Sequence, residues 1–275
     1  MFLILLIQKP LGTKFLEFFI HNYFRDFKNS VLVFSNSKPI GWWNDNNIAK
    51  LCNKHQITMF DSTNKIETLE LLVSLVKKFD DVRVVSVQFP WIIDEIILNS
   101  LKILPINLHL ADISKYRGWN SFSHAILNDD SNYSWNLHEI NRIVDTGQIL
   151  LSKTIEIHTH DTAKSLYQKT IASASESFSE VMDILLRNKS SVTSSLANLE
   201  NSPFYGKDSL KNYSFIESEK YNAQSLSRIS RALYFPPYPS PLLRKDGASQ
   251  PLLPLPVPDC NCESCNDLRV YFSRF

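Results

Sequence analysis

The chain has 275 residues, of which 44% are hydrophobic and 21% are charged. This composition is ample for a packed core and argues against intrinsic disorder. The 29 basic and 28 acidic side chains give a formal net charge of +1, so non-specific electrostatic binding to nucleic acid is not expected. The six glycines form neither a G-x-G-x-x-G loop nor a P-loop. No apolar run approaches the ~20 residues that a membrane span needs.

The first segment, residues 2–7 (FLILLI), is apolar and short. No basic segment precedes it and no small-residue cleavage site follows it, so it does not resemble a signal peptide. We predict instead that it is a buried strand that opens the fold, and that the protein is cytoplasmic.

Further stretches that favour strands follow at residues 31–34, 57–60, 82–87 and 103–108. Between the third and fourth strands, residues 66–79 carry apolar side chains at helical spacing. Strands alternating with helices predict an α/β fold, Rossmann-like, with a mostly parallel sheet and helices on both faces. Because ligands bind beyond the carboxyl ends of such strands, we expect the chemistry within residues 88–93 and 107–119.

A long amphipathic helix is predicted over residues 163–185, and the polar break that begins at Asn188 ends it. We therefore predict a main domain over residues 1–190 and a small C-terminal subdomain with a proline-rich tail over residues 191–275. Within the subdomain, one short helix is expected between Tyr221 and Leu233.

Two features of the C-terminal tail need separate predictions. The proline-rich stretch over residues 236–258 is predicted to hold no regular strand ladders. Cys260, Cys262 and Cys265 form C-x-C-x-x-C, which could contribute three thiolates to a zinc site, but no fourth ligand is evident nearby. We predict free thiols and no metal, with Cys52 as the remaining cysteine.

Three polar residues lie where the fold argument places a site. Asn107 and His109 are two residues apart at the end of a predicted strand, so their side chains face the same side. Asp145 lies in a turn marked by Gly147, just before another apolar strand. Each residue also has a purely structural reading: Asn107 as a cap on the strand end, His109 as a hydrogen-bonded loop residue, Asp145 as a turn former.

These residues belong to segments that resemble the signature of the folate-dependent formyltransferases. The matching segments are residues 105–109 (PINLH), 115–118 (KYRG), 123–127 (SHAIL), 145–149 (DTGQI) and 161–162 (DT). Several motifs in the right order and spacing are more specific than any one of them. The resemblance implies the formyltransferase fold, with residues 1–190 as the catalytic domain.

The resemblance also implies an activity and a set of site residues. Formyl-tetrahydrofolate would supply a formyl group to an amine, with Asn107, His109 and Asp145 as the catalytic set and no metal. The folate pocket would map to Gln88, Phe89, Pro90, Trp91, Ile92, Arg142, Ile143 and Val144. Phe89 and Trp91 could equally be core residues.

Several acceptor classes are compatible with this chemistry. A transfer-RNA formyltransferase would carry a basic C-terminal domain, but residues 191–275 hold nine basic and eight acidic side chains. The chain is more similar to the nucleotide-sugar N-formyltransferases, which implies a dTDP-linked amino-dideoxyhexose as acceptor, a role in O-antigen and lipopolysaccharide biosynthesis, and a homodimer. The alternatives that remain are another folate-dependent formyltransferase, a formyl-tetrahydrofolate hydrolase and a non-catalytic nucleotide-sugar-binding paralogue.

The candidate acceptor-binding residues are basic, aromatic or adjacent to such side chains. They are Lys9, Tyr116, Arg117, Gly118, Trp119, Arg231, Tyr234 and Phe235. An aromatic ring can stack on a nucleotide base, and an arginine can pair with a diphosphate. The alternative for the aromatic residues is that they pack the C-terminal subdomain.

Overall fold

The computed structural model describes residues 1–38, 46–187, 202–245 and 247–254. The chain divides into two compact units that interleave along the sequence. Unit 1 comprises Met1–Ile113, Trp135–Lys153 and Ile171–Asn201, and unit 2 comprises Ser114–Ser134, Thr154–Thr170 and Ser202–Phe275. The predicted domain boundary between residues 190 and 191 lies outside the described residues.

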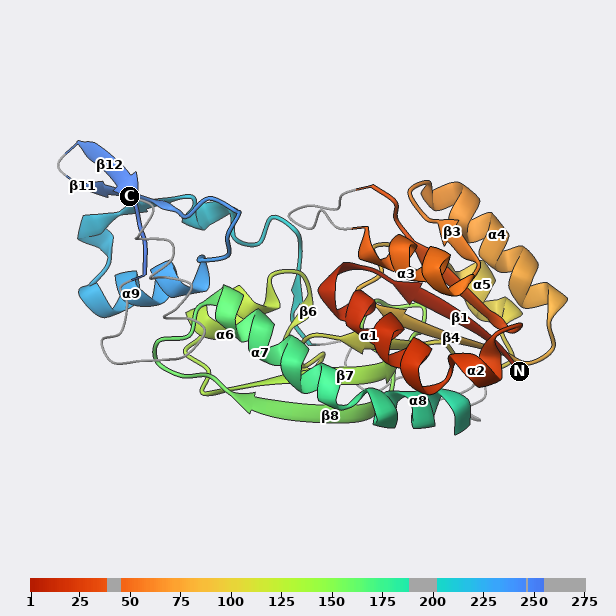
Figure 1. Ribbon diagram of the computed structural model, residues 1–275. Helices are drawn as coiled ribbons and strands as arrows, with labels where there is room; N and C mark the ends of the chain where they lie inside the picture. The colour runs from red at the N-terminus through yellow and green to blue at the C-terminus, as the bar shows by residue number, and fades with distance from the viewer. Residues whose placement is uncertain (39–45, 188–201, 246, 255–275) are drawn as a thin grey trace. The chain divides into compact units, whose positions relative to one another are not determined.

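The largest sheet has seven strands in the order β3-β2-β1-β4-β5-β7-β8 (Figure 1). They are β1 (Phe2–Ile7), β2 (Val31–Ser35), β3 (Met59–Asp61), β4 (Val82–Val87), β5 (Ile106–His109), β7 (Asn132–Glu139) and β8 (Ile149–Glu156). β1 pairs in parallel with β2 and β4, and β4 pairs in parallel with β5, whereas β5 and β7 are antiparallel. The predicted mostly parallel α/β sheet is confirmed. β5 begins after Pro105, which lacks an N–H for a ladder.

Helices cover both faces of β1, as predicted. On one face, Ile4 and Leu6 share a buried cluster with residues of α4 (Lys65–Lys78) and α5 (Glu95–Ser100). On the other face, α1 (Lys9–Asn22) lies so close to Ile7 that a Cβ atom at Gly12 would be 3.1 Å from the Ile7 Cβ atom. The continuous apolar sequence of β1 follows from burial on both sides.

The remaining helices of unit 1 are short. They are α2 (Phe24–Phe27), α3 (Asn47–His55) and α8 (Phe178–Arg187), and the ring of Phe178 packs edge-on against Phe15 of α1. The single helix predicted over residues 163–185 is two helices, because α7 (Ala163–Glu176) ends before Ser177 and α8 begins after it. In the part of the chain that the structure describes, no helix is both long and apolar enough to cross a membrane.

Unit 2 contains smaller elements. They are β6 (Arg117–Gly118), α6 (Ser121–Leu127), β9 (Phe204–Tyr205), η1 (Lys211–Tyr213), β10 (Phe215–Glu217), η2 (Ser218–Lys220), α9 (Ala223–Ala232), β11 (Leu242–Lys245) and β12 (Ala248–Pro251). The short helix predicted between Tyr221 and Leu233 is confirmed as α9. The prediction that residues 236–258 hold no strand ladders is wrong, since β11 pairs with β10 and β12. Prolines do not prevent this ladder because Pro241 precedes β11 and Pro251 ends the outermost strand.

Candidate active site

Asn107 and His109 lie on β5, which runs beside β4 in the sheet. Successive side chains of a strand point to opposite faces, so the buried Leu108 points away from the face that Asn107 and His109 share. Both polar side chains are half-buried, and the side chain of His109 is 16% exposed. β5 therefore presents an amide and an imidazole together on one face of unit 1.

Asp145 reaches the same place from the loop between β7 and β8. Its backbone adopts a left-handed conformation with φ of 54°, which Asp tolerates better than most residues. Two residues later, a Cβ atom at Gly147 would overlap the carbonyl oxygen of Glu139, so this close approach requires glycine. The buried Thr146 hydroxyl lies 2.9 Å from the Asn141 Oδ1 atom and 2.9 Å from the Ile143 carbonyl oxygen. The loop thereby holds the Asp145 carboxylate in a fixed position.

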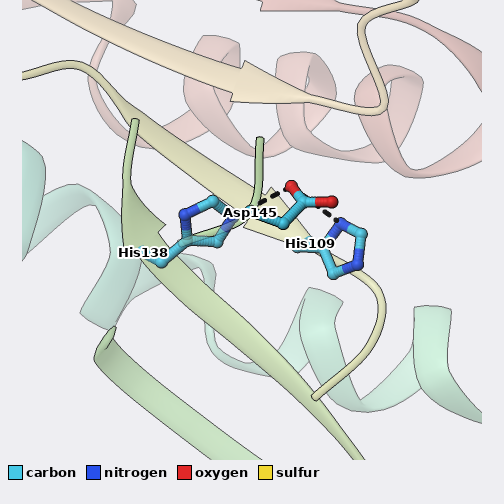
Figure 2. Close-up of side chains that lie close together, drawn as sticks. All are labelled: His109, His138 and Asp145. Atoms are coloured by element: carbon cyan, nitrogen blue, oxygen red, sulfur yellow. Dashed lines mark ion pairs between the residues drawn. The ribbon is translucent and has the colours of Figure 1, made fainter. Parts of the chain in front are cut away.

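The carboxylate of Asp145 lies between two imidazole rings (Figure 2). Its Oδ1 atom is 3.7 Å from His109 Nδ1 and 3.6 Å from Nε2 of His138, a residue of β7. The side chain of Asp145 is only 10% exposed. Asn107, His109 and Asp145, which the sequence predicted to be the catalytic set, are thus gathered in unit 1 together with a fourth polar residue.

His138 is the residue that sequence reasoning missed. Its side chain is 2% exposed, its Nδ1 atom donates to the Glu139 carbonyl at 2.8 Å, and its Nε2 atom lies 3.2 Å from Asn107 Nδ2. Burial, and to a smaller extent the nearby His109, lower the pKa of His138 to about 4 against the opposing effect of Asp145. The one available signal was the repetition of Asn-Leu-His at residues 107–109 and 136–138.

His109, His138 and Asp145 are also the one group of described residues whose ligand atoms, within 4.8 Å of one another, could together hold a metal ion. Two imidazoles and a carboxylate are metal-binding donors in general. The Nε2 lone pair of His138 already accepts a hydrogen bond from Asn107, so a metal would have to displace that bond. Cys260, Cys262 and Cys265 lie outside the described residues, and burial raises the pKa of the Cys52 thiol to about 12.

In the predicted folate segment after β4, three of the five side chains make structural contacts within unit 1. The Gln88 Oε1 atom accepts a hydrogen bond from Leu11 N at 3.0 Å, and the Trp91 indole donates to the Ser62 carbonyl at 2.7 Å. Phe89 packs against the buried cluster under the sheet. Pro90 is half-buried, and Ile92 is 61% exposed.

The predicted folate segment before Asp145 is more exposed. The Arg142 guanidinium pairs with Glu95 at 3.0 Å, although both side chains are largely exposed. Ile143 is 39% exposed and Val144 is half-buried. The Arg142–Glu95 pair links this segment to α5, and exposed ion pairs of this kind contribute little to stability.

Lys9 is the one acceptor candidate that lies in unit 1. It begins α1 with a φ of 59°, and burial lowers the pKa of its ammonium group. Its neighbour Gln8 is buried and accepts hydrogen bonds from Ser35 Oγ at 2.5 Å and Asn36 N at 2.8 Å. The chain around Lys9 is therefore anchored at the carboxyl end of β1 and β2.

The acceptor candidates Tyr116, Arg117, Gly118 and Trp119 lie in unit 2, and most are structural there. The Tyr116 hydroxyl donates to Asp130 at 2.7 Å, and burial raises the pKa of this buried phenol. Arg117 is 6% exposed and donates to the Ser202 carbonyl at 3.3 Å. Gly118, with a φ of 86°, pairs with β9 where a Cβ atom would overlap the Tyr205 carbonyl oxygen. Trp119 is the exception, since it is 53% exposed.

The remaining three candidates also lie in unit 2. Tyr234 is 2% exposed, and its carbonyl accepts a hydrogen bond from Lys164 N at 3.1 Å. Phe235 is half-buried, and Lys164 Nζ lies 4.9 Å from its ring centroid. Arg231 donates to the Asp161 carbonyl at 3.0 Å, while its buried Nε atom has no hydrogen-bond partner among the described residues. Arg231 and Phe235 thus keep groups with which a ligand could interact.

Comparison with known proteins gives several sequence relatives, most of which are named formyltransferases. GDP-perosamine N-formyltransferase from Brucella melitensis biotype 1 is 30% identical over 169 residues, which are 62% of this chain and 63% of that protein. The chain thus matches less than two thirds of that relative. The bifunctional polymyxin resistance protein ArnA from Wigglesworthia glossinidia brevipalpis is 30% identical over 142 residues, 52% of this chain and 21% of that protein.

Solved structures share the fold over nearly the whole chain. WlaRD, a sugar 3N-formyl transferase determined with dTDP and 5-N-formyl-THF, has a TM-score of 0.70 at 20% identity and covers 90% of this chain and 84% of its own. A 4-N formyltransferase from Francisella tularensis has a TM-score of 0.71 at 20% identity, with 94% and 98% covered. A family model described as formyl transferase matches residues 21–182, more than half of the chain. The chain belongs to the formyl transferase family and has the formyltransferase fold.

Proposed function

We propose that this chain is a nucleotide-sugar N-formyltransferase. It takes a formyl group from formyl-tetrahydrofolate and transfers it to the amine of a dTDP-linked amino-dideoxyhexose. The observation that carries the proposal is the meeting of Asn107, His109 and Asp145, which come from two distant segments and gather in unit 1 with separations of 3.7 Å or less between Asp145 and the imidazoles. The relatives that act on sugar amines support the acceptor class.

The reaction needs an oxyanion donor and a proton acceptor. The amine nitrogen attacks the formyl carbon, a C–N bond forms, and the carbonyl oxygen becomes an oxyanion that the Asn107 amide stabilises. His109 has its Nδ1 atom toward Asp145, so we assign Nε2 as the atom that takes the proton from the attacking nitrogen. Collapse of the tetrahedral intermediate breaks the bond between the formyl carbon and the folate nitrogen, and that nitrogen receives the proton. The products are a formamide and tetrahydrofolate.

Asp145 makes this proton transfer easier. Its carboxylate is largely buried and 3.7 Å from His109 Nδ1, so it stabilises the imidazolium that forms when His109 accepts the proton. Hydrogen bonds in ligand-free active sites are often long and shorten when substrate is bound. Neither the oxyanion donor nor the base in this mechanism is a metal, so transfer is expected to proceed without one.

The binding residues are proposed on the resemblance, with support that differs between segments. For the folate, we propose residues 88–92 and 142–144, where the exposed Ile92 and Ile143 offer apolar surface to an aromatic ring system. For the nucleotide-linked sugar, we propose Trp119, Arg231 and Phe235 as contacts in unit 2, and Lys9 as a separate candidate in unit 1. We assign a supporting role to the other candidates in unit 2, because their hydrogen bonds and strand pairing are made within that unit. They are Tyr116, Arg117, Gly118 and Tyr234.

Product analysis tests the proposed reaction. Purified protein is incubated with formyl-tetrahydrofolate and a panel of dTDP-, GDP- and UDP-linked amino sugars, and products are read by mass spectrometry for a gain of about 28 Da per formyl group, so that acceptor discrimination is measured directly. We expect one dTDP-linked amino sugar to be formylated fastest. Release of tetrahydrofolate without acceptor would indicate a hydrolase, and binding without turnover would indicate a non-catalytic paralogue. The role in surface polysaccharide synthesis, the homodimer and the cytoplasmic location remain predictions.

A further inference from the structure

β5 and β7 carry the same tripeptide, Asn-Leu-His, at residues 107–109 and 136–138. The two strands are antiparallel, and their register places each asparagine opposite the histidine of the other strand and the two leucines opposite each other. Directly opposed residues lie on the same face of a sheet. Two amides and two imidazoles therefore form a square of side chains on the face that carries the catalytic set.

The two copies differ in burial. Asn107 and His109 are half-buried, whereas Asn136 is 1% exposed and His138 is 2% exposed. A buried polar side chain is costly unless its hydrogen bonds are made. Asn136 and His138 direct their hydrogen bonds to other residues of unit 1, so these two residues are not placed to touch a substrate and instead fix their neighbours.

The bonds of His138 fix its ring. Its Nδ1 atom faces the Glu139 carbonyl oxygen at 2.8 Å, and a carbonyl can only accept, so the proton is assigned to Nδ1. Nε2 is then an acceptor, and Asn107 must direct its Nδ2 atom, not its oxygen, toward His138 at 3.2 Å. If the Asn107 amide were flipped, its oxygen would face His138 Nε2, and two acceptors would be buried against each other without a hydrogen bond.

Asn136 fixes the chain that follows His109. Its Oδ1 atom accepts a hydrogen bond from Ile113 N at 2.8 Å, and its Nδ2 atom donates to Ser152 Oγ at 2.9 Å. The segment that leaves β5 after His109 is thereby tied to β7. His138 thus hydrogen-bonds to Asn107 of β5, whereas Asn136 hydrogen-bonds to the backbone of the segment after His109.

We propose that His138 is a positioning residue for formyl transfer, which sets the amide orientation of Asn107 so that its second N–H is available to the oxyanion, with Asn136 in a parallel role toward the segment after His109. This inference rests on the proposed function for its rate effects. Both residues act through others, and neither contacts the reacting atoms. The buried Asn-Leu-His of β7 thus supports the half-buried Asn-Leu-His of β5. His138 contacts Asn107, and Asn136 contacts the backbone of the segment after His109.

A pair of substitutions separates positioning from packing. His138→Gln can still accept from Asn107 and donate to the Glu139 carbonyl, whereas His138→Leu fills the space without either bond. We expect His138→Leu to lower kcat by ~10²-fold, comparable to loss of an oxyanion donor, with KM for formyl-tetrahydrofolate nearly unchanged. His138→Gln should recover at least ~10-fold of that loss. His55→Leu, which alters a histidine of α3 elsewhere in unit 1, serves as the control and should leave kcat unchanged.

Equal kcat for the two His138 variants, or an effect on KM alone, would overturn the positioning role. A second measurement needs neither turnover nor a folded variant. Nitrogen-15 NMR of the wild-type protein should show His138 protonated on Nδ1 and unprotonated on Nε2 near neutral pH, and the reverse tautomer would overturn the inference. If the wild-type protein transfers no formyl group but shows the expected tautomer, the proposed function fails while the assigned geometry stands.

Discussion

The site of unit 1 and the candidate ligand residues of unit 2 use polar side chains differently. In unit 1, the Asp145 carboxylate lies within 3.7 Å of two imidazoles, and the proposed catalytic residues stay partly accessible. In unit 2, Tyr116 is bonded to Asp130 and Arg117 is 6% exposed. Strand geometry determines where Asn107 and His109 point, whereas a sequence motif alone did not distinguish ligand contacts from structural contacts in unit 2.

The largest effect on turnover should come from the proposed catalytic residues of unit 1. We expect His109→Asn to lower kcat by ~10²–10⁴-fold because the proton acceptor is lost, and Asn107→Ala to lower it by ~10²–10³-fold because an oxyanion donor is lost. Steady-state kinetics with formyl-tetrahydrofolate and the preferred acceptor measures both. Tyr133→Phe, which removes a buried hydroxyl bonded to Ser121 in unit 2, is the control and should keep normal turnover. Near-normal kcat in His109→Asn would remove the chemical role assigned to unit 1.

The buried His138 should make stability depend on pH. Burial lowers its pKa from 6.5 to about 4, so the unfolded chain binds a proton between these values while the folded chain does not. The free energy of unfolding should therefore fall as the pH is lowered from about 6.5 to about 4, by about 3 kcal/mol from this residue. Urea denaturation at several pH values measures the slope. His138→Gln should flatten it, and an unchanged slope in that variant would contradict the assigned burial effect.

The loop that carries Asp145 should tolerate no side chain at Gly147. A Cβ atom there would overlap the Glu139 carbonyl oxygen, so Gly147→Ala should lower the free energy of unfolding by ~1–3 kcal/mol and displace Asp145. Gly206→Ala is the matched control, because a Cβ atom at Gly206 meets nothing within 4 Å and should change stability by less than about 0.5 kcal/mol. Equal losses for the two variants, measured by urea denaturation, would show that the close approach at Gly147 is unimportant.

The smallest effect should come from unit 2. If Arg231 and Phe235 bind the nucleotide, Arg231→Gln and Phe235→Leu should each raise KM for the acceptor by ~10-fold, through loss of a charge-assisted hydrogen bond or of base stacking. KM for formyl-tetrahydrofolate should not change. The exposed Tyr221, replaced by alanine, is the control within unit 2. An unchanged acceptor KM in both variants would leave these residues with a structural role only.

Much of the sheet could be predicted from the sequence. β1 and β4 have the predicted bounds. Each is a short run of residues buried on both faces of the sheet, so the ends of the run mark the ends of the strand. The β11–β12 ladder departs from the prediction because the position of a proline, not the number of prolines in a segment, decides whether a strand can form. Pro241 precedes β11, and Pro251 is the last residue of the edge strand β12, and both are positions at which a sheet tolerates proline.

The proximity of the proposed catalytic residues could be predicted from the sequence, whereas the presence of His138 beside them could not. Asn107 and His109 were identified from their spacing on one strand, and Asp145 from its turn and from the family resemblance. His138 has no local pattern that links it to Asp145, since the two meet only after β7 pairs with β5 and the loop folds back. Side chains that act through cross-strand contacts become visible only when the register is known.

The most direct test of the proposed reaction is to follow the formyl carbon itself. Formyl-tetrahydrofolate labelled with carbon-13 in the formyl group is mixed with the protein and its preferred nucleotide-linked amino sugar, and NMR records where the label goes. The account predicts that the label appears in a formamide on the sugar nitrogen, in step with release of tetrahydrofolate, and that His109→Asn abolishes this signal. Label found in free formate, or retained on the folate, would contradict it.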